Sequence, residues 1–221
     1  MKLNPEPWQE KLPLAPLRAG WIIFCLLLLP GILFLCKIPE IQVPFFSVLA
    51  ALPACIGTCR QLGIKPLEFS DFALVTGGYV AIILLSMLAA APWKLFWDSM
   101  GVKYAESQDM LQMISTAARQ DQIRLYISVC VITPVVEEVL FRRIIYSSWH
   151  HIHPPTAFFG TSLIFSLAHF FLMGIPGLLI MGLAFQLAYL IRENLLTAML
   201  LHSVVNTMAF FVNIFGETNI R

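Results

Sequence analysis

Six side chains in the second half of the chain belong to the types that transfer protons or stabilise negative charge, and apolar residues surround them. They are Glu137, Glu138, Arg142, His169, His202 and Asn206. A carboxylate or an imidazole can take a proton from water, and an imidazole or amide N–H can donate a hydrogen bond to an oxyanion. An ionisable side chain at membrane depth costs roughly 2.5 to 3.5 kcal/mol on insertion scales, so each should have a partner, a water-filled cavity or a function. The set is suited to hydrolysis by an activated water.

The two neighbouring glutamates differ in what lies one helical turn away from them. Glu138 and Arg142 are four residues apart, so they share one face of a helix and can form an ion pair. Glu137 lies about 100° around the same helix, and its neighbour four residues on is the apolar Phe141. The spacing therefore assigns Glu138 to the ion pair and leaves Glu137 for chemistry.

Each histidine of the set has a partner at the same four-residue spacing. Phe165 precedes His169, and His202 precedes Asn206, so each pair shares a helix face. A single intramembrane histidine most often forms a hydrogen bond between helices. Two carboxylates, an arginine, two imidazoles and an amide would be a costly way only to hold helices together, so the combination favours an active site.

The elements that position these side chains must be helices in lipid. The chain has 221 residues, of which 58% are hydrophobic and 12% are charged, and its mean hydropathy is +0.79. Several apolar runs reach the roughly 17 to 25 residues that a spanning helix needs, and none alternates as a barrel strand does. The sequence predicts an all-α fold, a polytopic transmembrane helix bundle. A net charge of +1 without a basic block gives no reason to expect nucleic acid as a partner.

Hydrophobic runs also predict where the spans lie. Seven are expected, at 19–36, 43–59, 72–91, 125–146, 157–175, 177–191 and 195–215. They form one membrane domain, with N-terminal spans and an interfacial connection at 1–124, catalytic core helices at 125–215 and a tail at 216–221.

The stretch from Pro92 to Arg124 is long enough to hold structure of its own. Its aromatic residues Trp93, Phe96 and Trp97 are typical of an interfacial belt, and Glu106–Arg119 has the composition of a helix lying at the membrane surface. A solvated loop is the equally open alternative for this stretch.

Three ordered motifs, Glu-Glu-x-x-x-Arg, Phe-x-x-x-His and His-x-x-x-Asn, resemble those of the CPBP family. This family contains CAAX proteases and bacteriocin-processing proteins, among them the type II CAAX prenyl endopeptidases. The resemblance runs from residue 137 to residue 206. It implies a glutamate-type intramembrane endopeptidase, and it implies eight helices where the apolar runs predict seven.

The resemblance also implies a role for each motif residue. Glu137 would act with His169 to hold and deprotonate a water, because a glutamate in low dielectric is suited to that proton transfer. His202 and Asn206, one turn apart, would donate hydrogen bonds to the oxyanion. The supporting residues would be Glu138, Arg142 and Phe165.

Two other functions remain open. Glu137, His169 and His202 would be a suitable zinc set for a metalloprotease, although the chain has no His-Glu-x-x-His motif. A non-enzymatic scaffold or immunity-type membrane protein is the other alternative. For the endopeptidase no cofactor is predicted, and the expected partners are membrane lipid and a peptide or protein substrate. The expected location is the cell membrane, as a multi-pass integral protein.

Depth along the helices predicts where the site opens. If the last span begins near Leu195, His202 lies about 10 Å from that end of the span, since each helical residue rises 1.5 Å. The fourth span ends near Arg142, whose long side chain can reach the same surface. The sequence therefore predicts an opening toward the loops at 147–155 and 192–194, on a side to which the Lys and Arg distribution gives a weak cytoplasmic bias.

Overall fold

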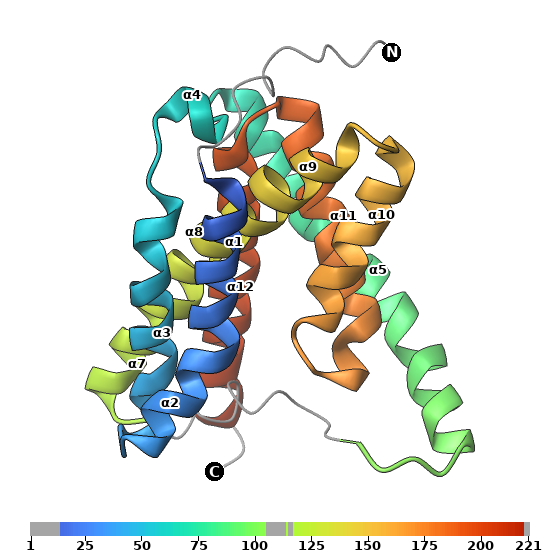
Figure 1. Cartoon of the computed structure of the whole chain (residues 1–221). Helices are drawn as coiled ribbons and strands as arrows, with labels where there is room; N and C mark the ends of the chain where they lie inside the picture. The colour runs from blue at the N-terminus through green and yellow to red at the C-terminus, as the bar shows by residue number, and fades with distance from the viewer. Residues whose placement is uncertain (1–13, 105–113, 115–116, 219–221) are drawn as a thin grey trace.

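Long helices form nearly all of the chain that the structure describes (Figure 1). The computed structural model describes residues 14–104, 114 and 117–218. No strand occurs among these residues. The predicted all-α class is confirmed.

The first half of the chain contains two helices that include 3₁₀ or π segments, and one long regular helix, α5. Labels with η mark 3₁₀ or π segments. The elements are α1 (Ala15–Ile23), η2 (Phe24–Leu28), α2 (Leu29–Leu35), η3 (Glu40–Gln42), α3 (Val43–Ala51), η4 (Leu52–Cys55), α4 (Cys59–Leu62) and α5 (Phe69–Ser99). The helix from α1 to α2 is continuous, as is the helix from η3 to η4, and α5 alone has 31 residues.

The second half contains all the candidate site residues. Its elements are α7 (Arg119–Tyr126), η5 (Ile127–Ile132), α8 (Thr133–Glu138), η6 (Val139–Tyr146), α9 (Ser147–His150), α10 (Pro154–Leu167), η7 (Leu172–Gly174), α11 (Ile175–Arg192) and α12 (Leu195–Thr218). The first five follow one another without a break, so one helix runs from residue 119 to residue 150. The remaining three helices run alternately down and up the bundle in Figure 1.

Several of these helices are suited to crossing a membrane. Among the described residues, four are long and apolar enough by length and composition: Ala15–Leu35, Phe69–Ser99, Leu172–Arg192 and Leu195–Phe215. The helix Glu40–Cys55 is apolar but shorter. An integral membrane helix bundle is therefore confirmed, whereas a count of seven or eight spans stays a prediction.

Two predicted span ends were wrong. The third span does not stop near residue 91, because α5 continues through Pro92 to Ser99 and carries the three aromatic residues of the predicted belt. The fifth does not run to residue 175, because α10 ends at Leu167 and Phe170 takes a left-handed backbone with φ 50°. Most of the predicted surface helix, Glu106–Arg119, lies outside the described residues.

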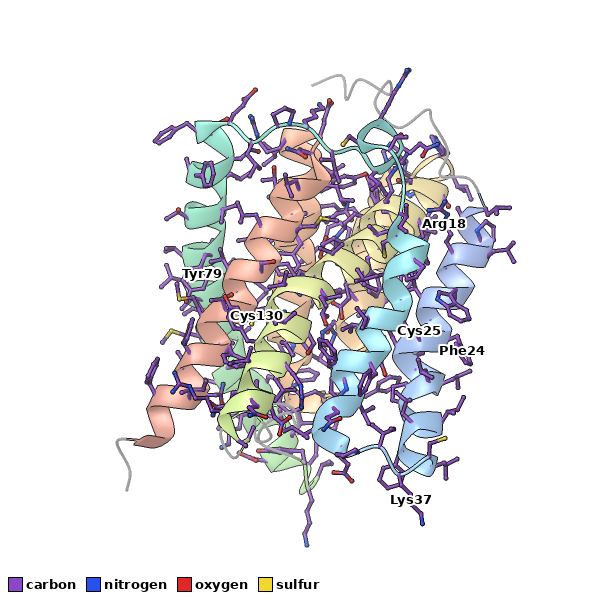
Figure 2. All side chains as sticks on the ribbon, turned by 90° about the vertical axis from the view of Figure 1, so that its left-hand side faces the viewer. Arg18, Phe24, Cys25, Lys37, Tyr79 and Cys130 are labelled. Carbon is purple, nitrogen blue, oxygen red and sulfur yellow. The ribbon has the colours of Figure 1, made fainter. Side chains whose placement is uncertain are left out.

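The centre of the bundle is packed around α11, which contacts α10, α5 and α12. Gly182 of α11 lies against the backbone of Ser162 in α10, where an added Cβ would come 3.1 Å from the Ser162 carbonyl oxygen. Only glycine permits this close approach without a shift of one helix. On the other side of the bundle, η5 with Cys130 lies between α3 and α12 (Figure 2).

A polar latch joins three helices at the end of the bundle where α5 begins. The buried carboxylate of Asp71 in the first turn of α5 accepts hydrogen bonds from Arg192 Nε of α11 at 2.8 Å and from Thr197 Oγ of α12 at 2.6 Å. It also accepts a hydrogen bond from the backbone N–H of Glu68 at 2.7 Å. The latch therefore fixes the ends of α11 and α12, the two helices that carry Phe185 and His202.

We expect Asp71→Ala to lower the free energy of unfolding by about 1–3 kcal/mol, because it leaves the buried Thr197 hydroxyl and the partly exposed Arg192 guanidinium without their shared acceptor. The matched control is Glu68→Ala, which removes an exposed partner of the same Arg192 and should cost less than about 1 kcal/mol. Thermal unfolding of the purified protein in detergent measures both. Equal losses of unfolding free energy in the two variants would show that the burial of Asp71 does not determine how much the latch stabilises the fold.

Candidate active site

A buried ion pair lies at the centre of a polar cluster inside the apolar bundle. Arg142 Nε of η6 donates to Glu138 Oε2 of α8 at 2.9 Å, and both side chains are 0% exposed. The predicted pairing of these residues, four apart on one helix, is confirmed. Because both side chains are buried, each charge needs the other: either charge alone in this interior would strongly lower the stability of the fold.

His202 of α12 links the two glutamates, an arrangement that the motif spacing did not predict. Its Nδ1 lies 3.0 Å from Glu138 Oε1, and its Nε2 lies 3.9 Å from Glu137 Oε2. The Glu138 carboxylate also accepts from Arg142, so it acts as an acceptor and Nδ1 is the donor. The ring is thereby held in one orientation, with Nε2 directed at Glu137.

Aromatic rings enclose this imidazole. Phe185 of α11 stacks on His202, with ring centroids 4.5 Å apart and an interplanar angle of 19°. Phe165 of α10 meets the same ring edge-on at 5.8 Å, and the Arg142 guanidinium lies 5.5 Å from the centre of the Phe165 ring. Phe165 therefore supports both the imidazole and the guanidinium, as predicted for a supporting residue, while Phe185 was missed.

Gln186, the neighbour of Phe185, is a second residue that sequence reasoning missed. Its side chain is fully buried, and its Oε1 accepts from Arg142 Nη1 at 3.4 Å. The available signal was a single amide within an otherwise apolar predicted span, 177–191. The buried Nη2 of Arg142 and Nε2 of Gln186 have no hydrogen-bond partner among the described residues.

Glu137 is the member of the cluster that remains available for chemistry. Its side chain is 14% exposed, and its Oε2 has no hydrogen-bond partner among the described residues. Glu138, in contrast, uses both carboxylate oxygens within the interior. The predicted difference between the two glutamates therefore agrees with their contacts, although the catalytic role itself stays a prediction.

His169 lies beyond the end of α10, in the turn that leads to α11. Its Nδ1 donates to the Phe165 carbonyl at 2.8 Å, which leaves Nε2 as the nitrogen able to accept a proton or a hydrogen bond. The ring lies 4.8 Å from the ring of Phe165. No ion pair joins His169 to Glu137 in the described part of the chain, so the structure does not bring this predicted pair into direct contact.

Asn206, one turn of α12 after His202, is anchored to a neighbouring helix. Its Nδ2 donates to the Val129 carbonyl of η5 at 2.8 Å. η5 is π-helical, and such a segment replaces the i→i−4 pattern and occurs often at functional sites. An amide nitrogen carries two hydrogens, so the second N–H of Asn206 can still donate to a substrate atom.

The predicted opening toward the loops at 147–155 and 192–194 is not seen along the described helix that carries Glu138, and it stays a prediction. Six consecutive residues between Glu138 and that end of the helix are 5% exposed or less: Val139, Leu140, Phe141, Arg142, Arg143 and Ile144. Packing encloses this segment on all sides because it lies at the centre of the bundle. Exposure rises in the other direction, through the partly buried Glu137 and Thr133 to Val131, which is 49% exposed.

The described residues do not form a ready set of zinc ligands. Among the described residues, no three His, Cys, Asp or Glu side chains are grouped so that they could hold a metal ion. Glu137 and His202 approach each other at 3.9 Å, and the Nδ1 of His169 is occupied by its bond to the Phe165 carbonyl.

Comparison with known proteins identifies the segment that carries the site. Residues 119–208 match the family model described as type II CAAX prenyl endopeptidase Rce1-like. The matched segment includes all three motifs, so the resemblance drawn from them is confirmed, and a protease is supported at the level of the family. No curated protein matches the chain, and no solved structure matches it.

Breaking the central ion pair should damage folding more than removing the charge of Glu137. We expect Glu138→Gln and Arg142→Ala each to cost roughly 3 to 5 kcal/mol of stability, because each leaves the other charge buried without its partner. Glu137→Gln should be milder, because Glu137 lies at the exposed edge of the cluster. Thermal unfolding in detergent measures all three. Equal damage from the three changes would contradict the assignment of structure to Glu138 and chemistry to Glu137.

Proposed function

We propose that this chain is an intramembrane endopeptidase in which Glu137 activates water and the intermediate is stabilised by His202 and Asn206. The observation that carries the proposal is the position of the His202 ring, between Glu138 at 3.0 Å and Glu137 at 3.9 Å in an apolar interior. The family match to residues 119–208 supports the same reaction class.

Charge balance in this cluster favours a protonated His202. Glu138 and Arg142 neutralise each other, which leaves Glu137 and His202 as the remaining pair. A net charge in a low-dielectric interior is costly, so a single proton held between the two keeps the cluster neutral. With the proton on His202, Nδ1 donates to Glu138 and the Nε2–H is available on the side of Glu137.

The first step of the proposed reaction is attack by water on the peptide carbonyl. A water held between Glu137 and the bare Nε2 of His169 gives one proton to Glu137 as its oxygen bonds to the carbonyl carbon. The new oxyanion accepts hydrogen bonds from Nε2–H of His202 and from the second N–H of Asn206. Glu137 becomes neutral as the oxyanion forms, so the total charge of the site does not change.

In the second step the tetrahedral intermediate collapses. Glu137 returns its proton to the amide nitrogen, the C–N bond breaks, and the amine product leaves together with the new carboxylic acid. Glu138 and Arg142 hold His202 in place throughout and exchange no proton. Each residue of the cluster therefore has either a structural or a chemical task.

The substrate is proposed to be a peptide or protein that reaches the site from the membrane. The description of the matched family names prenyl endopeptidases, so a prenylated C-terminal peptide is the first substrate to test. A matched peptide without the lipid separates recognition of the chain from recognition of the lipid. The cell membrane is the proposed location.

Glu137→Gln is expected to reduce the rate of peptide cleavage by about 10²- to 10⁴-fold, the usual contribution of a general base. The assay uses protein purified in detergent and a fluorogenic prenylated peptide. The control is Glu193→Gln, which alters a carboxylate that pairs with Lys65 away from the cluster and should leave the rate unchanged. Full activity of a folded Glu137→Gln variant would remove Glu137 from the mechanism, and a non-enzymatic scaffold would cleave neither peptide.

Metal removal should have no effect on the proposed reaction. Glu137 and His169 supply the acceptors for the water, so treatment with 1,10-phenanthroline is expected to leave the cleavage rate unchanged. Elemental analysis of the purified protein should find no stoichiometric zinc. Loss of activity with chelator and its recovery on addition of Zn²⁺ would instead support the metalloprotease alternative.

A further inference from the structure

We propose that Trp93 and Ser166 are positioning residues for His169, an inference that rests on the proposed function in which this imidazole holds the water. α10 ends at Leu167, so His169 belongs to the turn at 168–174 and not to a helix. A helix would fix the direction of a side chain by its own backbone bonds. The position of the His169 imidazole therefore depends on how firmly the turn itself is held.

Trp93 holds the middle of this turn from outside. Its indole Nε1–H, on α5, donates to the Leu172 carbonyl at 3.0 Å, across 79 positions of sequence. Trp93 is itself packed against Phe96 and Trp97, with ring centroids 6.1 and 5.6 Å away. The donor is therefore well anchored, and the turn is tied to α5, a helix that carries none of the motif residues.

Ser166 closes the base of the same turn. Its hydroxyl, fully buried in the last turn of α10, donates to the Ile175 carbonyl at the start of α11 at 2.8 Å. The two hydrogen bonds thus act on different parts of the turn, one on its base and one on its middle. His169 lies between these two points in the sequence, and its own Nδ1 bond to Phe165 completes the placement.

The backbone of the turn explains why external bonds are needed. Phe170, next to His169, has φ 50° although it carries a side chain, and that side chain is 83% exposed. A left-handed conformation costs free energy for any residue except glycine and persists where surrounding structure maintains it. The exposed Phe170 ring provides little packing, and the backbone bonds of the turn, such as Phe170 N–H to the Leu167 carbonyl at 3.1 Å, are local. The hydrogen bonds from Trp93 and Ser166 add the connections to α5 and to the start of α11.

The chain offers matched controls for both residues. Trp97 lies one turn after Trp93 on α5, and its buried indole N–H has no hydrogen-bond partner among the described residues. Trp21 donates an indole bond of similar length, 2.9 Å, to Ala50 in a region remote from the turn. Ser162, one turn before Ser166, donates only within its own helix, to Phe158.

The experiment compares Trp93→Phe and Ser166→Ala with Trp97→Phe, Trp21→Phe and Ser162→Ala. We expect kcat to fall about five- to tenfold in the first two variants, with KM unchanged, because loss of one hydrogen bond releases the turn without removing a substrate contact. The three controls should keep the kcat of the unaltered protein. In a His169→Ala background, Trp93→Phe should cause no further loss, because its effect acts through the imidazole.

A readout independent of activity separates this inference from the proposed function. Diethyl pyrocarbonate modifies accessible imidazoles, and mass spectrometry measures the rate of modification of His169 separately from the other histidines. We expect that rate to rise about fivefold in Trp93→Phe and Ser166→Ala and to stay unchanged in the controls. If the modification rate rises in this way but the protein cleaves no peptide, the positioning role is supported and the proposed function is not. Equal rates in Trp93→Phe and Trp97→Phe, or additive losses of kcat with His169→Ala, would overturn the inference.

Discussion

The ion pair between Glu138 and Arg142 is the interaction on which the arrangement of the other helices depends. Both charges are fully buried, so partners for their remaining donors and acceptors have to come from the neighbouring helices. α12 supplies His202 to the carboxylate, and α11 supplies Gln186 to the guanidinium. One local pair on a single helix therefore fixes the relative positions of three helices, and the His202 imidazole is one of the groups that it fixes.

The helix that carries this pair is itself unusual, because π-helical segments flank α8 on both sides. Each π segment changes the register of the faces that follow it, and it also exposes backbone groups that a regular helix would pair. Asn206 uses this property when it binds the Val129 carbonyl of η5. The irregular backbone thus brings α12 against the helix at Asn206, four residues beyond the contact that His202 makes with Glu138.

Local spacing was sufficient to predict the helical class and the pairing of Glu138 with Arg142, because both depend on residues close in sequence. It was insufficient for the bridge from Glu138 to His202, which are 64 positions apart, and for the contribution of α11. The end of α10 was missed for another reason: apolar residues continue through the turn at 168–174, where only His169 and Gly174 interrupt them. Tertiary packing determines where the chain reverses direction between α10 and α11, and the hydropathy of the sequence does not indicate that position.

The same turn carries His169, a member of the candidate site. In the helix from residue 119 to residue 150, residues 138–144 are buried and separate Glu137 from α9. α10 starts beside α9 and runs away from it, which places the turn at 168–174 on the other side of the ion pair. Glu137, His169 and Asn206 are the partly exposed members of the candidate site, whereas Glu138, Arg142 and His202 are buried. The hydrogen bonds from Trp93 and Ser166 therefore act on the segment that carries His169, and the placement of this imidazole depends on contacts from outside the helix that carries the ion pair.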